Sequence, residues 1–580
     1  MRTLIILRIY HPFEHFSPQI DTPNQSLVED APKSSQIESP LELIPDPLKR
    51  QTPFRSNKGI PKSTYEPDLT SKAKYPMSHY VSNHRLSESN RSFVNQLSSV
   101  SIPNNMQEAL ADSRWKAAMN EEMKSLQKNN TWELVDLPLG KKPVGCRWVY
   151  TVKYKADGTI ERFKARLVAK GYTQTYGIDY METFAPVAKI NTVRVLLSLA
   201  VNLDWPLHQF DVKNAFLHGD LTEEVYMDLP PGCHIPGKHQ RKVCRLKKSL
   251  YGLKQSPRAW FGRFTKSMRA FGYNQSNSDH TLFLKKQHGM ITALIVYVDD
   301  MVVTGNDTEE RKSLQNYLSN EFEMKDLGPL KYFLGIEVSR SEKGIFLSQR
   351  KYALDLLQET GMSACQPADT PMEEGLKLCI DSNQVPTDKG RYQRLVGRLM
   401  YLAHTRPDLA YALSIVSQFM HNPGEQHMSA IMRILRYLKS TPGKGVLFSK
   451  GVDHLKVEAY TDADWAGSID DRRSTSGFFA FVGGNLVTWK SMKQNVVARS
   501  SAESEYRGMA LRICEVLCLS HLLRDLGYLA RYLIGLYCDN KAACDIANNP
   551  VQHDRTKHME IENFIIKEKL EVKIIELPKI

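Results

Sequence analysis

The chain has 580 residues, of which 42% are hydrophobic, and Lys and Arg exceed Asp and Glu by 13. This length and hydrophobic content predict several domains with real cores and exclude a wholly disordered chain. Residues 1–105 contain 12 basic and 10 acidic side chains, so nearly all of the positive excess lies in the remainder of the chain. A basic folded body favours a polyanionic partner; the alternative is a merely basic soluble protein.

The nine cysteines are scattered and form no Cys-x-x-Cys pair. This pattern argues for a reducing compartment and against a disulfide scaffold or a zinc finger. Cys514 and Cys518 lie one helical turn apart and are interpreted as core packing. The early apolar run at residues 4–7 is too short for a secretion signal, and no run approaches the ~18 residues of a membrane span. We therefore expect an intracellular protein with no membrane association.

The first ordered segment is expected to follow a long leader. Residues 1–105 hold 12 Pro and 16 Ser without a sustained period, which predicts disorder. From about residue 108, apolar positions fall on one helix face (Trp115, Met119, Met123 and Leu126). Residues 146–154 and 162–168 then predict a basic antiparallel hairpin around a Lys-Ala-Asp-Gly turn.

A helix at about 190–204 and a strand at 208–212 come next, followed later by the most informative tetrad, Tyr297-Val298-Asp299-Asp300. The tetrad ends an apolar run and precedes another, which predicts a tight hairpin with two acids at its tip. Crowding two carboxylates at the end of buried strands is unfavourable unless a cation binds there. Carboxylate oxygens suit Mg²⁺ or Mn²⁺. A solvated Asp-Asp turn is the alternative interpretation.

A third acid is expected beside this hairpin. Asp211 lies at the end of the strand at 208–212, so two strands would project three carboxylates into one pocket. Two metal ions about 3.5–4 Å apart in such a pocket can activate a primer 3′-hydroxyl and hold the triphosphate of an incoming nucleotide. The carbonyl of Val212 would add a neutral ligand.

Long strings in a fixed order resemble the reverse transcriptase and ribonuclease H portion of plant copia-type LTR retrotransposon Pol polyproteins. The resemblance covers about residues 106–560. It rests on Lys164-Ala-Arg-Leu-Val-Ala-Lys-Gly171, Glu182-Thr-Phe-Ala-Pro-Val187, Asp211-Val-Lys-Asn-Ala-Phe-Leu-His-Gly219, Ser249-Leu-Tyr-Gly-Leu-Lys-Gln-Ser-Pro-Arg-Ala-Trp260 and Tyr297-Val-Asp-Asp300.

The resemblance implies roles around an incoming nucleotide. Asp211 and Asp299 would ligate metal, and Asp300 would tune the site electrostatically and ligate transiently. Phe216 would be a steric gate that selects deoxynucleotides, or else an ordinary core aromatic. Gln255 would contact the nucleotide. Lys164 and Arg166 would neutralise its triphosphate, or else form a solvated cationic ribbon.

Two further roles follow from the same resemblance. The segment Phe333-Leu334-Gly335-Ile336 looks like the primer grip, which packs under the last sugar of the primer. Lys325 resembles the basic residue that protonates departing pyrophosphate. Four helices are then expected, at residues 352–360, 392–404, 408–419 and 425–438.

A second acidic series begins after Lys456. Asp462 ends a strand, Glu505 lies in the first turns of a Ser-capped helix, and Asp539 ends another strand. This order is the ribonuclease H pattern, a second two-metal site that hydrolyses phosphodiesters. Asp464 and Glu503 are the local competitors for these positions.

The fourth acid of that pattern departs from the family, which usually has Asp where this chain has Glu562. The extra methylene moves the carboxylate by about 1.5 Å, a misplacement that can lower the rate ~100-fold. The chain's end also looks shorter than usual. His553 is interpreted as a surface histidine or as the mobile histidine of product release. The nuclease is therefore the less certain of the two activities.

The predicted fold class is α/β (α+β), a right-hand polymerase followed by a ribonuclease H-like mixed-sheet domain. The predicted divisions are a leader at 1–105, fingers and palm at 106–345, a mostly helical thumb and connection at 346–455, and the ribonuclease H-like domain at 456–580. No protease, integrase or zinc-knuckle motif precedes the polymerase. We therefore expect a truncated element copy.

The predicted function is RNA- and DNA-templated DNA synthesis with degradation of the RNA in RNA–DNA hybrids, using two Mg²⁺ or Mn²⁺ ions per site. The expected partners are an RNA template, a DNA primer and deoxynucleoside triphosphates. The family context implies cytoplasmic particles and then the nucleus. One rival is a catalytically silent nucleic-acid-binding relic. The other is a maturase-like splicing factor, which would need an RNA-binding domain where this chain has its second acidic series.

Overall fold

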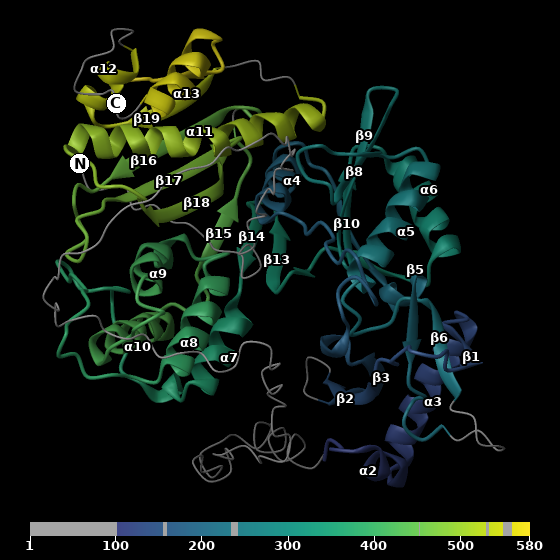
Figure 1. Ribbon diagram of the computed structural model, residues 1–580. Coiled ribbons are helices and arrows are strands. Elements are labelled where there is room, and N and C mark those ends of the chain that lie inside the picture. Colours follow the sequence, from purple (N-terminus) through teal and green to yellow (C-terminus); the bar gives the residue numbers. More distant parts are fainter. Residues whose placement is uncertain are drawn as a thin grey trace, which may run out of the picture.

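The computed structural model describes residues 101–154, 159–233, 242–451, 453–528, 533–548 and 560–579. The predicted leader therefore lies outside the described residues except for 101–105, as do the turn at 155–158 and His553. The described part of the chain forms five β-sheets and many helices, a mixed α/β fold as predicted (Figure 1).

The N-terminal region is built on a helix and a hairpin. Helices α2 (Met106–Ala111) and α3 (Ser113–Lys128) begin at caps supplied by Asn105 and Asp112. The predicted hairpin is confirmed as β2 (Cys146–Tyr154) paired with β3 (Ile160–Ala169). Trp115 of α3 is buried against it, with ring centroids 5.5 Å from Tyr150 and 4.8 Å from Phe163.

A small sheet beside this hairpin has the order β1-β6-β5. Its strands are Trp132–Asp136, Lys242–Lys248 and Asp220–Met227. Alternate residues of β6 and β5 face a shared core with Leu126 and Leu167, so this sheet, α3 and β3 form one packed unit.

The central sheet has six strands in the order β11-β4-β10-β9-β8-β7. Their bounds are β4 Leu207–Val212, β7 Asn274–Gln275, β8 Leu282–Gln287, β9 Met290–Tyr297, β10 Asp300–Gly305 and β11 Met324–Pro329. Met301 and Val303 of β10 face helices α5 (Ser256–Ala270) and α6 (Thr308–Glu321), whereas Val302 faces the opposite core with α4 (Ile190–Asn202). Both faces of the sheet are therefore covered, which explains why its strands are apolar throughout.

The middle of the chain combines a second sheet with four helices. Strands β12 (Tyr332–Phe333), β13 (Ile336–Ser341), β14 (Gly344–Ser348) and β15 (Gly445–Phe448) pair in that order. Because β15 returns to pair with β14, the segment between them closes on itself. This segment contains the four predicted helices, observed as α7 Arg350–Glu359, α8 Lys389–Leu402, α9 Ala410–Ser417 and α10 Glu425–Ser440.

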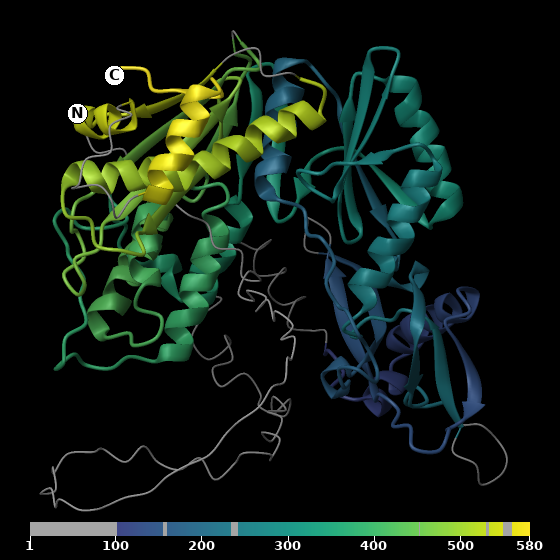
Figure 2. The ribbon, with the colours of Figure 1, turned by 45° about the horizontal axis from the view of Figure 1, so that its top comes forward.

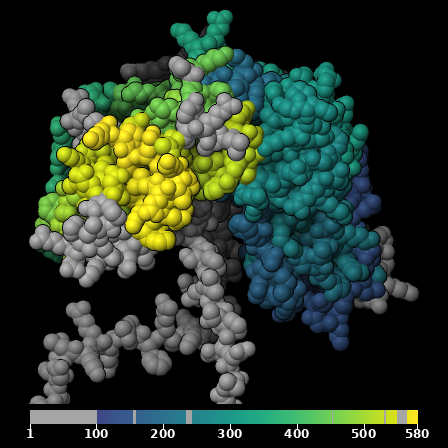
Figure 3. All heavy atoms as spheres, turned by 90° about the horizontal axis from the view of Figure 1, so that it is seen from above, coloured from purple at the N-terminus to yellow at the C-terminus, as the bar shows by residue number. Residues whose placement is uncertain are grey.

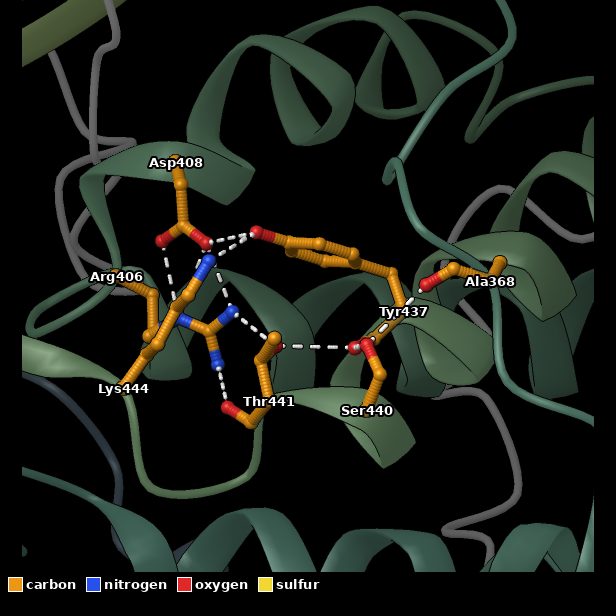
Figure 4. Close-up of polar contacts among 7 residues, drawn as sticks. All are labelled: Ala368, Arg406, Asp408, Tyr437, Ser440, Thr441 and Lys444. Atoms are coloured by element: carbon orange, nitrogen blue, oxygen red, sulfur yellow. Dashed lines mark hydrogen bonds and ion pairs between the residues drawn. The ribbon is translucent and has the colours of Figure 1, made fainter.

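An ionic network centred on the buried side chain of Arg406 links parts of this helical segment (Figure 4). Arg406 is 1% exposed; its guanidinium donates to Asp408 Oδ2 at 2.8 Å and to the carbonyl of Thr441 at 2.8 Å. Tyr437 of α10 donates to the same carboxylate at 2.8 Å and accepts from Lys444 at 3.1 Å. Burial alone would raise the pKa of Asp408, but Arg406 and Tyr437 outweigh it and lower the pKa below its ordinary value.

The C-terminal sheet has the order β18-β17-β16-β19-β20, with β16 and β19 parallel. Its strands are β16 Val457–Ala463, β17 Thr475–Val482, β18 Asn485–Lys493, β19 Ile534–Cys538 and β20 Ile575–Glu576. The long helix α11 (Ser501–Asp525) crosses one face, together with α12 (Lys541–Asn548) and α13 (Glu560–Glu571) (Figure 2). Cys514 and Cys518 of α11 are both exposed, so the interpretation of these residues as core packing was wrong.

Helix α4 packs between the central and C-terminal sheets. Its Arg194 is 2% exposed, with the guanidinium carbon 3.7 Å from the ring centroid of Trp489. Arg194 donates to the carbonyl of Val487 in β18 at 3.1 Å, and Ser198 donates to the carbonyl of Val482 at 2.7 Å. A single continuous core therefore runs from α4 through the helical segment into the C-terminal sheet, across the predicted boundary at 455/456.

A second contact joins the C-terminal unit to the central sheet. Asp525, at the end of α11, accepts hydrogen bonds from the hydroxyls of Ser276 and Ser278, each at 2.7 Å. The space-filling view shows the two units in contact along this side (Figure 3). Every described helix is too short or too polar to span a bilayer.

The Arg406 network predicts a pH-dependent contribution to stability. Because the folded-state pKa of Asp408 is lowered, its contribution is present above the unfolded-state pKa and is lost as the pH falls through the acid range. Asp408→Asn should lower the free energy of unfolding by about 3 kcal/mol near neutral pH, because it leaves Arg406 buried without its anion. Urea unfolding followed by circular dichroism measures the difference. The exposed Asp355→Asn is the control, and a difference that is the same at pH 3 and pH 7 would contradict the ionic assignment.

Candidate active sites

The turn between β9 and β10 holds the two adjacent acids in a strained conformation. Val298 has a φ of +55°, which is unfavourable for a β-branched residue. Two hydrogen bonds fix it: Trp260 Nε1 of α5 donates to the carbonyl of Val298 at 2.7 Å, and the amide of Val212 donates to the carbonyl of Asp299 at 2.8 Å. The neighbouring helix and strand therefore stabilise a turn that the local sequence alone disfavours.

Strand register brings the third acid to the same place. Asp211 of β4 lies directly opposite Asp300 of β10 and, on its other side, opposite Lys325 of β11. Opposed residues project to the same face, with Cβ atoms roughly 5 Å apart. Gln209 Nε2 donates to Asp300 Oδ1 at 3.4 Å. The structure thus gathers the three predicted carboxylates at one end of the central sheet.

The electrostatics of the three acids reflect this crowding. Burial, followed by the charges of Asp299 and Asp211, raises the pKa of Asp300 to about 6. Burial and Asp299 also raise the pKa of Asp211, although Lys164 and Lys325 oppose this shift. A cluster of half-buried, mutually repelling hard oxygens is the donor set that a divalent cation stabilises. Val212 is buried beside it; a ligand role for its carbonyl stays a prediction.

A basic group of residues faces these acids from strand β3. Burial, with the charges of Arg166 and Arg162, lowers the pKa of Lys164. Arg166 lies over the ring of Tyr251 at 4.4 Å, and its buried Nε has no hydrogen-bond partner among the described residues. Such a donor fits an anionic ligand.

Glu122 is a charged residue that the sequence analysis missed. It is 6% exposed on the buried face of α3, and its carboxylate accepts from the amide of Leu167 at 3.3 Å. Burial raises its pKa, while Arg166 and Lys164 lower it. Its position between Met119 and Leu126 in the apolar stripe was the signal that could have identified it.

Phe216 lies in the short 3₁₀ helix Ala215–His218, directly after Asp211 and Val212. Its ring meets that of Tyr251 edge-on, with centroids 4.9 Å apart. Burial raises the pKa of Tyr251 to about 12; Arg166 opposes this shift, whereas Asp299 and Asp211 add to it. Tyr251 therefore lies between Phe216 and Arg166, close enough to Asp299 and Asp211 to be affected by their charges. The sequence analysis missed it, although it lies within the quoted string 249–260.

The position of Gln255 argues against the predicted nucleotide contact. Its side chain is completely buried. Its amide nitrogen donates to the carbonyl of Asp179 at 2.9 Å, and its amide oxygen accepts from Gln174 Nε2 at 3.0 Å. Both polar ends are thus engaged within the protein, so we infer that Gln255 holds the loop at 174–179 in place.

A cavity of about 240 Å³ opens beside Asp300. It is bounded by the central sheet, the 332–336 segment and helix α8, with the lining residues Ala188, Ile190, Gln209, Tyr297, Asp300, Tyr332, Leu334, Gly335, Ile336, Tyr401 and His404. Leu334 has a φ of +50°, and its carbonyl accepts from the Tyr401 hydroxyl at 2.7 Å. At Gly335, φ is +69° and a Cβ would lie 2.1 Å from that hydroxyl, so only glycine fits.

The second acidic cluster lies at the carboxyl ends of β16 and β19, two parallel inner strands of the C-terminal sheet. Asp462 is the penultimate residue of β16, Glu505 belongs to α11 and Asp539 directly follows β19. Glu505 Oε1 accepts from the amide of Ala463 at 2.9 Å. Burial raises the pKa of Glu505 well above its ordinary value; the Ala463 hydrogen bond opposes this, and Asp462 and Asp539 add to it. Asp462 and Asp539 therefore both lie close enough to Glu505 to act on its pKa.

The local competitors have other partners. Glu503 Oε1 accepts from Arg507 Nε at 3.0 Å, and Glu503 Oε2 accepts from the amide of Arg499 at 2.9 Å. Asp464 accepts from the amide of Thr475 in β17. These contacts favour Glu505 and Asp462 as the clustered acids. Glu562 falls within helix α13, but its side chain lies outside the described residues, so its proximity to the cluster stays a prediction.

Comparison with known proteins identifies the family. Residues 129–374 match the model of the reverse transcriptase (RNA-dependent DNA polymerase) family. The retrovirus-related Pol polyproteins from transposons RE1 and RE2 of Arabidopsis thaliana are 45% and 44% identical, over 82% and 83% of this chain. That from transposon TNT 1-94 of Nicotiana tabacum is 41% identical over 80% of the chain.

The matched segment spans about a third of each of these relatives (32%, 33% and 35% of their lengths). The mixed arrangement of sheets and helices fits a reverse transcriptase domain, to which residues 129–374 are matched. The chain belongs to the copia-type retrotransposon Pol polyprotein family.

The raised pKa of Asp300 predicts how metal-free stability varies with pH. Because its folded-state pKa exceeds that of the unfolded chain, charged Asp300 destabilises the fold above about pH 6, and this penalty vanishes as the pH falls toward 4. Asp300→Asn should therefore stabilise the metal-free protein by about 2 kcal/mol at pH 8 and little at pH 4. Thermal unfolding in a chelator measures this. Added Mg²⁺ should shrink the gain, and an equal gain at both pH values would refute the charge-crowding argument.

Proposed function

We propose that this chain is an RNA-directed DNA polymerase whose active site is formed by Asp211, Asp299 and Asp300. The observation that carries the proposal is the strand register that sets Asp211 opposite Asp300, with Asp299 in the strained turn beside them. Three carboxylates on two adjacent strands suit the chemistry of nucleotide addition, in which developing charge on phosphate and hydroxyl oxygens must be stabilised.

Asp211 and Asp299 would hold divalent cations, Mg²⁺ or Mn²⁺, with Val212 contributing its carbonyl oxygen. When bound, two such ions lower the pKa of the primer 3′-hydroxyl and neutralise the triphosphate. Asp300 accepts from Gln209 and would set the charge of the pocket. Lys164 and Arg166 would bind the triphosphate from the β3 side. Lys325, which lies opposite Asp211 in β11, would protonate departing pyrophosphate.

Phe216 is proposed as the steric gate against ribonucleotides. Its ring is braced by Tyr251, which Arg166 covers in turn, so the ring cannot rotate away freely. A fixed ring excludes a 2′-hydroxyl by overlap, whereas a loose one would yield. The cavity beside Asp300 and the segment Phe333 to Ile336 are proposed to receive the primer end, because they lie between the acids and helix α8.

The C-terminal unit is proposed to be a ribonuclease H domain that cleaves the RNA of RNA–DNA hybrids. Asp462, Glu505 and Asp539, with Glu562 as the fourth acid, would hold two divalent cations in the same manner. The proximity of the first three acids supports this assignment. The proposed divisions are fingers and palm at 106–345, thumb and connection at 346–455 and ribonuclease H at 456–580, with action in cytoplasmic particles and the nucleus.

The polymerase proposal predicts that Asp299→Asn abolishes primer extension. On poly(rA) with an oligo(dT) primer and Mg²⁺ or Mn²⁺, dTTP incorporation should fall by about 100-fold or more, since the amide cannot replace the anionic ligand. Asp136→Asn, an exposed residue of β1, is the matched control. Incorporation unaffected by Asp299→Asn would reject the site, and primer-template binding without extension by the unaltered chain would indicate the catalytically silent relic.

The reciprocal variant separates the two sites. Glu505→Gln should abolish cleavage of an RNA–DNA hybrid and leave primer extension intact, whereas Asp299→Asn should do the reverse. Loss of both activities in both variants, with unchanged melting temperatures, would refute two independent sites.

The steric gate predicts a change in sugar selection. Phe216→Val removes the ring and should raise the ratio of ribonucleotide to deoxynucleotide incorporation by about 100-fold. Phe216→Tyr keeps the ring and should keep the discrimination. The ratio of kcat/KM for GTP and dGTP on a poly(rC) template measures both. An unchanged ratio in Phe216→Val would show that Phe216 is an ordinary core aromatic.

A further inference from the structure

Two thiols lie beside the acids of the C-terminal cluster. Cys538, the last residue of β19, is 4% exposed, and its sulfur is 3.8 Å from Glu505 Oε2. Cys544 of α12 places its sulfur 3.8 Å from the carbonyl oxygen of Cys538. The ligand atoms of Glu505, Cys538 and Asp539 all lie within 4.8 Å of one another, the one such group of three in the part of the chain that the structure describes.

This mixed donor set differs from that of the cluster at Asp211. Mg²⁺ takes oxygen ligands and is not selected by sulfur. Thiolate ligands instead select Zn²⁺, which is bound in tetrahedral sites by combinations of cysteine sulfur, histidine nitrogen and carboxylate oxygen. Glu505, Cys538 and Asp539 supply three donors that are already grouped. Cys544 of α12 lies outside that group but beside Cys538, and it offers a fourth donor of a kind that Zn²⁺ prefers.

We propose that Cys538, Cys544, Glu505 and Asp539 form a Zn²⁺ site that overlaps the nuclease acids. Bound Zn²⁺ engages Glu505 and Asp539 and so competes with the catalytic Mg²⁺ at the C-terminal cluster. Each thiol releases its proton to solvent when the metal binds, and no oxidant takes part. The inhibition by Zn²⁺ rests on the proposed nuclease function, whereas the binding of Zn²⁺ does not.

Zn²⁺ should prefer this site to the cysteines of α11 and to the Asp211 cluster. Cys514 and Cys518 are exposed on α11, away from the group that Glu505, Cys538 and Asp539 form, and the acids Asp211, Asp299 and Asp300 offer oxygen donors only. The Zn²⁺ concentration that inhibits RNA cleavage should therefore be lower than the concentration that inhibits DNA synthesis. Such a site makes hybrid degradation responsive to the level of free zinc.

A binding experiment tests the site without reference to activity. The full chain, with Cys514→Ser and Cys518→Ser to remove the exposed pair, is titrated with Cd²⁺ as a spectroscopic substitute for Zn²⁺. We expect an ultraviolet sulfur-to-metal charge-transfer band that saturates at one Cd²⁺ per chain and is displaced by Zn²⁺. Adding Cys544→Ser should halve the band and weaken binding by about tenfold or more, since loss of even an outer partner of a ligand typically costs 10–100-fold.

The absence of a saturable band, or a band unchanged by Cys544→Ser, would overturn the proposal. Melting temperature in a chelator confirms that each variant is folded. Because this measurement needs no turnover, its failure is distinguishable from failure of the proposed nuclease.

An inhibition experiment tests the consequence. Hybrid cleavage with Mg²⁺ is measured against increasing Zn²⁺ and normalised to each variant's own rate without Zn²⁺. The concentration for half inhibition should rise about tenfold in Cys544→Ser and stay unchanged in the Cys514→Ser, Cys518→Ser chain. Primer extension on the same preparation should persist at that concentration. Equal inhibition of cleavage in all three chains, or simultaneous loss of primer extension, would refute a thiol-based site.

Discussion

The pairing of β4 with β10 is the constraint on which the polymerase-like half depends. It sets Asp211 opposite Asp300 at the end of a sheet that is apolar on both faces. Burial and the resulting charge repulsion both disfavour the charged form of Asp300, and together they raise its pKa to about 6. Packing of the strands by α5, α6 and α4 offsets this repulsion. The sheet thus holds three acids closer together than they would lie in a free chain. A cation that binds there would not have to bring the acids together, because the fold has already placed them.

Helix α4 ties this half to the rest of the molecule. The buried guanidinium of Arg194 covers Trp489 and donates to β18, while other residues of the helix face the central sheet. A charged group can be buried so deeply because carbonyl oxygens accept its hydrogen bonds and because its charge makes a cation–π contact with the indole ring. One core therefore supports both acidic clusters, and the distance between them is set by packed helices.

The charge distribution follows the same logic. The chain is basic overall, yet the acids around Asp211 form a concentrated negative patch with the basic side chains of Lys164 and Lys325 at its margin. Basic side chains attract a polyanion over distance, whereas clustered acids favour a cation. The two clusters differ in their softest donor: only the C-terminal one, among the described residues, includes sulfur. Under the proposed Zn²⁺ site, that difference would give the two clusters different metal preferences.

The sequence alone determined the local elements and supplied the acids as candidates. The hairpin with Asp299 and Asp300, the strand with Asp211 and the four helices between 350 and 440 were readable from local pattern, whereas the choice of Asp462, Glu505 and Asp539 over their neighbours came from the resemblance to the family. Only the tertiary structure decided which side chains join them. Tyr251 and Glu122 were brought to the site, Gln255 was buried against residues far away in the chain, and Cys544 was placed beside Cys538. The reason is physical: an element's own residues fix its period, whereas its neighbours are fixed by the packing of distant segments.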